Sequence, residues 1–542
     1  MSAKGRKVKK SSRTKRRRIK RHSLPERKFT SRIFKRSKKQ KAVEEAPREL
    51  ITGRRLWLFR IIALTIIPAL LFLLLEIALR VVGYGFPTHI TVKSKVNSVP
   101  SYSNNNKFSW RFFHPNIART TDPFIFPVKK SDYTYRVFVM GASAAAGTPD
   151  GGFSFGRILQ AMLRHQYPET NFEVMVPAMP AINSHVVLEV AKDCARYQSD
   201  LFIVYLGNNE VVGPYGAGTV FSSLSPNLSL IRFGIAFKAT RLGQLMNNLL
   251  ELTGSGDTPK VWRGMEMFLE KQVRANNVNL PIVYSHFQRN LEGICRLATK
   301  RGIKTIFCTV PGNLKDSPPF ASLHRSDLTE TEEKSWEGLY QQGIKFETEG
   351  NYAQAVEQYL AAADIDGSYA DLQFRLGRCY WAMGEYEKSR ERYVRARELD
   401  TLRFRADNQI NEIIRNIARD RTDEGVYLLD AVKTFEENSS YGTPGKELFY
   451  EHVHMNFDGN YLLAGTICEQ VEKILPARIK TNKAKERLFP TEEECARILA
   501  YTDWEEYKIY NTVLSDYIKQ APFTNQLYQD QRVSQMEQKI KN

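Results

Sequence analysis

Three residue types that can carry out acyl transfer together occur at two places in this chain. Ser143 lies in the small-residue run Gly141-Ala142-Ser143-Ala-Ala-Ala-Gly147, and Glu451 precedes His454 by three residues in Glu-His-Val-His. A serine hydroxyl becomes a nucleophile when an imidazole takes its proton, and a carboxylate holds that imidazole in the required tautomer. A glycine and a serine after a strand more often form only a turn, so the elements around them must support this chemistry.

Strands that alternate with helices would bring these residues together. Residues 135–140 are apolar and predict a strand; a tight turn and a helical pattern over 153–163 follow them. This order places Ser143 at the carboxyl end of a strand and near a helix N-terminus, where free backbone N–H groups can receive a developing oxyanion. Apolar runs at 200–206, 304–310 and 426–429 predict further strands, each followed by a polar or glycine-rich loop. The pattern predicts an α/β fold with a parallel sheet and a site along its carboxyl edge.

With these blocks in this order, the chain resembles the SGNH (GDSL-like) hydrolase and acyltransferase superfamily. The resemblance implies a three-layer α/β sandwich of the flavodoxin-like type. It assigns Ser143 as nucleophile, His454 as histidine, Glu451 as acid and Asn209 as the third residue of Gly-x-Asn-Asp. Asn456 and Gly459 continue the family's His-x-Asn-x-x-Gly pattern, and the supporting residues are Gly141, Gly207, Asn208 and Asn456.

The sequence departs from this family at five positions. The family's Gly-Asp-Ser-Leu reads Gly-Ala-Ser-Ala, the acid is Glu451, and Glu210 replaces the aspartate of the third block. The family's oxyanion hole implies N–H groups from Ser143 and from a second-block glycine, for which Ala178 stands here, together with the Asn209 side chain. If that position needs a positive φ, an alanine is strained there. His452 is expected to lie off the triad, because Phe449 rather than an acid precedes it by three residues.

A repeat with a period of 34 residues lies between the Gly-Asn-Asn-Glu block at 207–210 and the Glu-His-Val-His block at 451–454. Shifting residues 343–366 by 34 superposes Gly343 on Gly377, Tyr359 on Tyr393 and Ala362 on Ala396. This resembles the tetratricopeptide repeat, and two repeats over 331–402 are expected to dock a protein or peptide partner. A helix with isoleucines at 410, 413, 414 and 417 is expected to cap the pair. A purely structural helical insertion is the alternative.

Net charge and hydropathy predict a membrane anchor. The formal charge is +20, but residues 1–55 hold 23 of the 79 Lys and Arg and only 4 of the 59 Asp and Glu. The remaining body is nearly neutral, which argues against a nucleic-acid groove spread over the fold. Residues 56–85 are apolar and long enough to span a bilayer, and Glu76 and Arg80 are spaced to pair. The positive-inside rule then puts the N-terminus in the cytoplasm and the C-terminal domain on the outer side of the cell membrane, which is the periplasm if the cell is Gram-negative.

The sequence therefore divides into seven expected segments. They are a basic, disordered cytoplasmic tail at 1–55, a transmembrane helix at 56–85, a linker or N-terminal extension at 86–132, the first hydrolase part at 133–330, the repeats at 331–402, the last hydrolase part at 403–475 and a helical extension at 476–542. The region 213–257 is expected to be either a lid or a plain surface insertion. The six cysteines have no metal-ligand spacing, so no metal and no cofactor are expected.

Two functions remain open from the sequence. The first is a membrane-anchored serine esterase or O-acyl(acetyl)transferase that acts on an ester of an extracytoplasmic glycan or lipid. The second is a catalytically degenerate hydrolase fold that serves as a membrane-bound scaffold.

Overall fold

The computed structural model describes residues 53–541, except 253–258, 420 and 485–488. The predicted tail at 1–55 thus lies almost wholly outside the described residues. The chain divides into two compact units, residues 1–69 and 70–542, which we describe separately.

The apolar segment near the N-terminus is helical. It comprises α1 (Gly53–Ile61), a π-helical turn η1 (Ile62–Ile66) and α2 (Ile67–Val81). The helical residues 56–81 contain an 18-residue window with a mean hydropathy of 2.6, none of which is buried. The helix is therefore long and apolar enough to cross a membrane, a test that a signal sequence also passes. The predicted pair is present, because Arg80 Nε donates to Glu76 Oε1 at 2.8 Å.

A five-stranded parallel sheet organises the α/β part, in the order β5-β4-β6-β7-β8. The strands are β4 (Thr134–Gly141), β5 (Asn171–Met175), β6 (Leu201–Tyr205), β7 (Lys304–Cys308) and β8 (Val426–Leu429). The first strand of this sheet, β4, lies between β5 and β6, so the chain runs to one side and then returns to the other. Open α/β sheets form their crevice where the strand order reverses, here at the carboxyl ends of β4 and β6.

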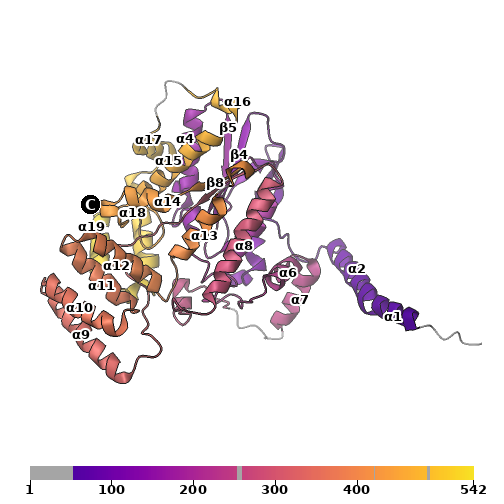
Figure 1. Ribbon diagram of the computed structural model, residues 1–542. Coiled ribbons are helices and arrows are strands. Elements are labelled where there is room, and N and C mark those ends of the chain that lie inside the picture. Colours follow the sequence, from indigo (N-terminus) through magenta and orange to yellow (C-terminus); the bar gives the residue numbers. More distant parts are fainter. Residues whose placement is uncertain (1–52, 253–258, 420, 485–488, 542) are drawn as a thin grey trace, which may run out of the picture. The chain divides into compact units, whose positions relative to one another are not determined.

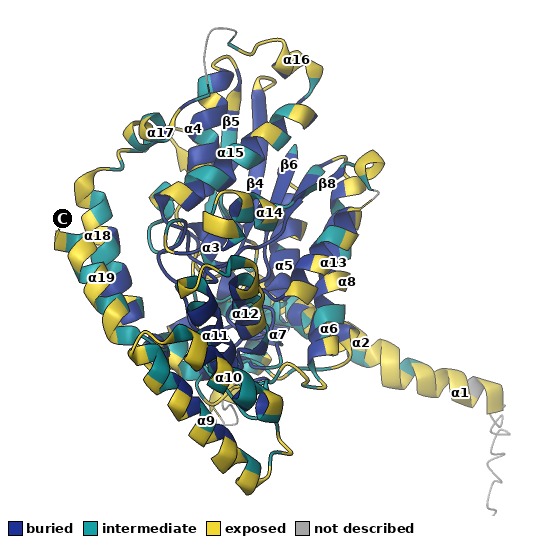
Figure 2. Ribbon diagram, turned by 60° about the vertical axis from the view of Figure 1, so that its left-hand side comes forward, coloured by how far each residue is buried: buried dark blue, intermediate teal, exposed yellow. Residues whose placement is uncertain are grey.

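Helices in two groups complete the three layers (Figure 1). In one group α4 (Phe155–Gln166) packs on α15 (Phe457–Ile474); in the other, α8 (Leu280–Thr299) contacts both α5 (Ser184–Cys194) and α13 (Asn408–Ala418). The strands are buried between them, as the dark blue of Figure 2 shows. The predicted α/β class and parallel sheet are therefore confirmed.

Helix α13 does not cap the repeats as expected. Its four isoleucines are buried in the same core as the sheet, and the helix packs on α8, β7 and β8. The stripe was correctly predicted to be helical and apolar, but a stripe alone does not say which neighbour it faces, and the larger apolar surface was the sheet.

The remaining elements either precede β4 in the chain or connect the strands and helices of the layers. Residues 86–132, predicted as a linker or extension, contain an antiparallel sheet of β1 (Thr91–Val96), β2 (Val99–Asn104) and β3 (Ile125–Pro127). Short helical elements are η2 (Phe108–Arg111), η3 (Pro115–Ile117), α3 (Ser143–Ala146), η4 (Gly151–Phe153), η5 (Gly264–Phe268), η6 (Thr422–Glu424), α14 (Ala431–Glu437) and η7 (Ser440–Gly442). The region 213–257 forms α6 (Leu228–Lys238) and α7 (Arg241–Leu252).

The repeat segment forms two helix pairs with a core of their own. They are α9 (Glu330–Thr348) with α10 (Tyr352–Asp366) and α11 (Ala370–Ala382) with α12 (Tyr386–Leu399). A Cβ on Gly343 would lie 2.3 Å from the Tyr359 ring, and one on Gly377 would lie 2.8 Å from the Tyr393 ring. The period of 34 therefore repeats one packing contact, in which a glycine of the first helix accommodates a tyrosine of the second.

The C-terminal extension is helical, as its pattern predicted. It comprises α16 (Ala477–Lys480), α17 (Glu492–Leu499), α18 (Asp503–Val513), η8 (Leu514–Ile518), η9 (Phe523–Asn525) and α19 (Gln529–Lys541). Tyr528 packs against Phe374 of the repeats, with ring centroids 6.3 Å apart. The extension therefore lies against the repeats as well as the α/β part.

Candidate active site at the carboxyl edge of the sheet

The turn that carries Ser143 is fixed by two glycines. A Cβ on Gly141 would lie 2.1 Å from the carbonyl oxygen of Tyr205, so the ends of β4 and β6 meet only because this residue is glycine. Gly147 ends α3 with a left-handed φ of 85°, and its N–H donates to the Ser143 carbonyl at 3.0 Å. Ser143 is half-buried at the first position of this helix, as predicted.

The Gly-Asn-Asn-Glu block follows β6 at the same edge. A Cβ on Gly207 would lie 2.8 Å from Ile410, so the glycine allows α13 to approach. Asn208 is buried and accepts a hydrogen bond from Ala406 N–H at 3.0 Å, which is a supporting role. Asn209 is half-buried, and its Nδ2 donates to the Ile182 carbonyl at 3.2 Å, which links this block to the loop after β5.

The loop after β5 corrects one expectation about Ala178. Ala178 is buried but does not have a positive φ; the left-handed residue of this loop is Ala181, with φ 62°. Glu210 holds the end of the loop, because its carboxyl accepts from Ser184 N–H at 2.9 Å and Ser184 Oγ at 2.8 Å. Burial raises the pKa of the Glu210 carboxyl to about 8, against the hydrogen bonds from Ser184, which lower it.

Glu451 contacts both histidines of the last block. Its Oε1 accepts from His454 N–H at 3.1 Å and contacts His454 Nδ1, and its Oε2 contacts His452 Nδ1. Burial would raise the pKa of the Glu451 carboxyl, but the two imidazoles hold it well below its usual range. The three-residue spacing predicted that Glu451 would contact His454 and not His452, and this separation is wrong. Glu451 also contacts the adjacent His452, because each of its carboxylate oxygens contacts the Nδ1 of one imidazole ring.

The surroundings of the two rings distinguish them. His452 lies edge-on to three phenylalanine rings, Phe320, Phe404 and Phe523, and burial lowers its pKa. His454 Nε2 is buried and has no hydrogen-bond partner among the described residues. A buried nitrogen without a partner costs about 1–3 kcal/mol in an ordinary core, and a site that needs a proton acceptor is a common reason to find one.

The C-terminal extension supplies ring contacts that the sequence did not predict. The Tyr517 ring lies 5.6 Å from that of His454, and the Phe523 ring lies 5.5 Å from that of His452. These residues lie more than 60 positions after the histidines, without a motif or a period that would link them, so only the fold reveals the contact.

Asn456 follows the two histidines and is the N-cap of α15. It caps α15, accepting from Gly459 N–H at 2.9 Å while its Nδ2 donates to the Glu447 carbonyl at 3.0 Å. A Cβ on Gly459 would lie 2.2 Å from the Leu448 carbonyl. The cap and the glycine hold together the two ends of the loop that carries Glu451 and His454.

Glu451, His452 and His454 also form a group of possible metal ligands, with donor atoms within 4.8 Å of one another. Two imidazoles and a carboxylate are ligands that zinc takes. In the structure, however, the Nδ1 atoms of both rings face the carboxylate oxygens as hydrogen-bonding partners.

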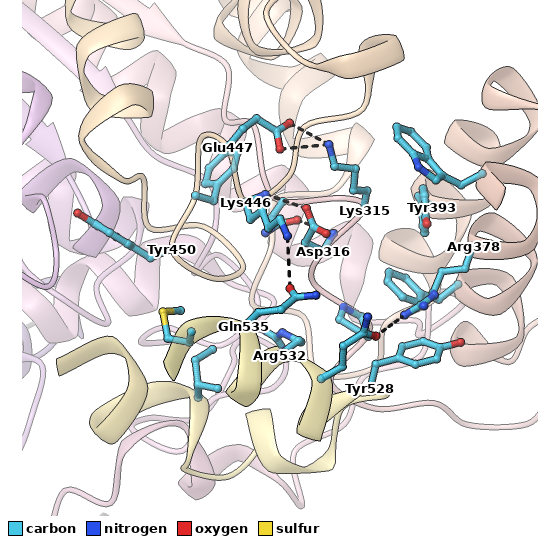
Figure 3. A pocket seen from close by; sticks show the side chains of 18 of the residues that line it. Lys315, Asp316, Arg378, Tyr393, Lys446, Glu447, Tyr450, Tyr528, Arg532 and Gln535 are labelled. Carbon is cyan, nitrogen blue, oxygen red and sulfur yellow. Dashed lines mark hydrogen bonds and ion pairs between the residues drawn. The ribbon is translucent and has the colours of Figure 1, made fainter. Parts of the chain in front are cut away.

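A cavity of about 760 Å³ lies between α11, α19 and the loop around Lys446 and Glu447 (Figure 3). Lys315 and Arg375 in its wall pair with Glu447 and Glu347. Three further cations contact glutamine amides of the C-terminal extension: Arg378 contacts Gln531, Lys446 contacts Gln535 and Arg532 contacts Gln526. The Arg378 guanidinium also lies 3.6 Å from the centroid of the Tyr528 ring. Burial lowers the pKa of Arg532 to about 10, although Glu451 and Asp316 raise it.

Comparisons with known proteins find a family model that matches the repeat and solved structures that are similar to the chain. Residues 348–405 match the tetratricopeptide repeat family model, and a search of curated proteins finds no match. Similar solved structures include a GDSL-like lipase from Bacteroides thetaiotaomicron VPI-5482 (10% identity, 65% of this chain and 93% of that chain, TM-score 0.29). An acetylxylan esterase from Geobacillus stearothermophilus (9%, 62% and 94%, TM-score 0.30) and a lipase/acylhydrolase from Enterococcus faecalis (10%, 65% and 100%, TM-score 0.27) are others. The chain thus carries tetratricopeptide repeats in an α/β fold that is similar to GDSL-like lipases and acylhydrolases.

Proposed function

We propose that this protein is a membrane-anchored serine esterase or O-acyltransferase. The observation that carries the proposal is His454: Glu451 contacts its Nδ1, and its buried Nε2 has no hydrogen-bond partner among the described residues. Ser143, the proposed nucleophile, begins a helix at the carboxyl end of β4. That nitrogen suits a group that takes the Ser143 proton as the hydroxyl attacks an acyl carbonyl and then returns it to the leaving group.

The oxyanion would be held by backbone N–H groups near the helix start and by the Asn209 amide. Asn209 Nδ2 already lies beside the loop after β5, at 3.2 Å from the Ile182 carbonyl. With Ala181 rather than Ala178 in the left-handed conformation, Ala178 can remain an N–H donor without backbone strain. Each such donor contributes about 10²- to 10³-fold in rate where it acts.

Labelling with a fluorophosphonate probe tests the nucleophile. The probe should label the full-length wild-type protein at Ser143 and should not label Ser143→Ala, provided that both proteins melt at the same temperature. Hydrolysis of an aryl acetate by the same preparations gives the rate. A folded wild-type protein that neither reacts nor hydrolyses would instead support the degenerate scaffold.

The substrate is proposed to be an O-acyl ester of a glycan or lipid outside the cytoplasm. The anchor and the basic N-terminal flank support that side of the membrane. A reporter at the C-terminus checks it: alkaline phosphatase should be active there, and an active cytoplasmic reporter would reverse the orientation.

The repeats are proposed to dock a partner protein at the cavity of Figure 3. Arg378, Lys446 and Arg532 line it and contact glutamine amides, and Arg378 also lies over the Tyr528 ring. A ligand carboxylate would make stronger, charge-assisted hydrogen bonds with these cations than an amide does. A glutamate-rich peptide should therefore bind the full-length protein more tightly than its glutamine counterpart. The double variant Arg378→Gln with Lys446→Gln should abolish that preference, and the control Arg157→Gln with Lys300→Gln, at exposed cations outside the cavity, should keep it.

A further inference from the structure

Helices α6 and α7 present apolar side chains to solvent beside the end of the apolar helix α2. On α6 the exposed residues are Leu230 and Phe233, with Phe233 68% exposed; on α7 they are Met246, Leu249 and Leu252, with Leu252 83% exposed. The opposite side of α6 is also apolar, but there Leu228, Ile231 and Ile235 are buried in the protein. A helix that is apolar on both sides needs a second apolar environment on the outer side.

The exposed apolar residues of each helix lie on one face of that helix. Leu230, Phe233 and the half-buried Phe237 follow one another at three and four residues, and the Phe233 and Phe237 rings stack with centroids 6.2 Å apart. Met246, Leu249 and Leu252 are each three residues apart on α7. Residues three and four apart lie on the same side of a helix, so both stripes are continuous.

Helix α7 is hydrogen-bonded to the end of the helix that is apolar enough to span a membrane. Glu76 of α2 accepts hydrogen bonds from Arg241 N–H at 3.1 Å and Leu242 N–H at 2.8 Å, so its carboxylate caps the start of α7. Gln244 Oε1 accepts from Phe86 N–H at 2.9 Å, and Asn248 donates to the Tyr84 hydroxyl at 2.7 Å. Both figures show α6 and α7 beside the end of α2.

We propose that α6 and α7 lie in the lipid interface of the membrane that α2 enters, as a second attachment to the same leaflet. Amphipathic helices of this kind insert their apolar side at the boundary of headgroups and acyl chains. The attachment would fix the orientation of the sheet relative to the bilayer, which a single helix followed by a free linker would not do. The inference rests on the membrane anchor of the proposed function and is independent of the ester chemistry.

Site-directed fluorescent labelling of the full chain tests this face. The six native cysteines are all buried, so a newly introduced exposed cysteine can be labelled selectively. The test variants are Phe233→Cys and Leu249→Cys, each carrying an environment-sensitive dye and reconstituted in phosphatidylcholine vesicles with and without doxyl-labelled acyl chains. The matched control is Ile498→Cys, an exposed apolar position in the C-terminal extension, and Leu73→Cys reports on the anchor itself.

The expected result is quenching of the dyes at 233 and 249 that is at least twofold stronger than at 498. If the dye at 73 is quenched while those at 233 and 249 behave like the one at 498, the anchor stands and this inference is overturned. If the dye at 73 is not quenched either, the membrane anchor of the proposed function fails, and the inference fails with it.

Discussion

Two glutamates, one buried at the sheet edge and one half-buried in the repeats, each gather several hydrogen-bond donors and yet suit different tasks. Glu451 contacts the imidazoles of His452 and His454. Glu347 accepts from Tyr359 Oη at 2.7 Å, Arg375 Nη1 at 2.8 Å and Tyr528 Oη at 2.5 Å. An arginine keeps its charge at any physiological pH, whereas an imidazole gains and loses a proton near neutrality.

This difference distinguishes a candidate catalytic site from a structural hydrogen-bond cluster. Around Glu347 the charge is permanent, and the partners come from α10, α11 and the residue before α19, so the carboxylate joins three segments. Around Glu451 both partners can change charge, and one of them keeps a buried ring nitrogen without a partner among the described residues. A rich hydrogen-bond network is common to both, so that feature alone does not identify a catalytic group.

The largest expected effect is at the sheet edge. Ser143→Ala and His454→Ala should each lower kcat on an aryl acetate by about 10⁴-fold or more, because the serine is inert without a base and the base has no other nucleophile. The double variant should be hardly slower than either single one. A well-folded Ser143→Ala protein with full turnover would contradict the nucleophile assignment.

Replacing each glutamate by glutamine tests this difference between Glu451 and Glu347 directly. Glu451→Gln should reduce kcat by about 10³- to 10⁴-fold, because an amide does not stabilise the imidazolium. Glu347→Gln should leave kcat within about twofold and lower the free energy of unfolding by about 1–3 kcal/mol, because charged hydrogen bonds are lost. Rate measurements and denaturant titrations on both variants check this, and equal losses of kcat would mean that the repeats are part of the catalytic unit.

His452→Ala should have a smaller effect on rate than His454→Ala. His452 is enclosed by aromatic rings, so its removal leaves a cavity and should lower stability by about 2–4 kcal/mol, as large-to-small core changes do. Turnover should fall less than with His454→Ala, since Glu451 can still hold the other ring. A larger loss of kcat for His452→Ala at equal folding would exchange the roles of the two histidines.

Stability should depend on pH through Glu210. Its pKa is raised to about 8 in the folded protein, so the folded state favours the protonated carboxyl. Its unfavourable contribution is absent below the unfolded value, near 4.3, and grows as the pH rises from there to about 8. Glu210→Gln should therefore gain melting temperature relative to wild type between pH 5 and pH 9, and a constant difference between the two proteins would argue against this shift.

The smallest expected effect is that of chelation. If His454 acts as a base, incubation with EDTA followed by desalting should leave turnover within about twofold, and added zinc should not raise it. Loss of activity on chelation, restored by zinc, would instead assign Glu451, His452 and His454 as metal ligands.

The sequence by itself determined the parts of this protein that depend on local order. Alternating strands and helices placed Ser143 and Asn209 at one sheet edge, because all parallel strands end on the same side. The period of 34 identified the repeats, because each glycine and its tyrosine partner are only 16 residues apart. The apolar run at 56–81 needed only its length and composition.

Tertiary structure decided what depends on contacts between distant segments. It placed α13 on the sheet rather than on the repeats, and an antiparallel sheet where a linker was expected. It brought Tyr517 and Phe523 onto the two histidines and left the buried His454 Nε2 without a hydrogen-bond partner among the described residues. These outcomes depend on which surfaces pack against one another. The sequence of an amphipathic stripe, or of two histidines one residue apart, does not indicate which distant segment will contact it.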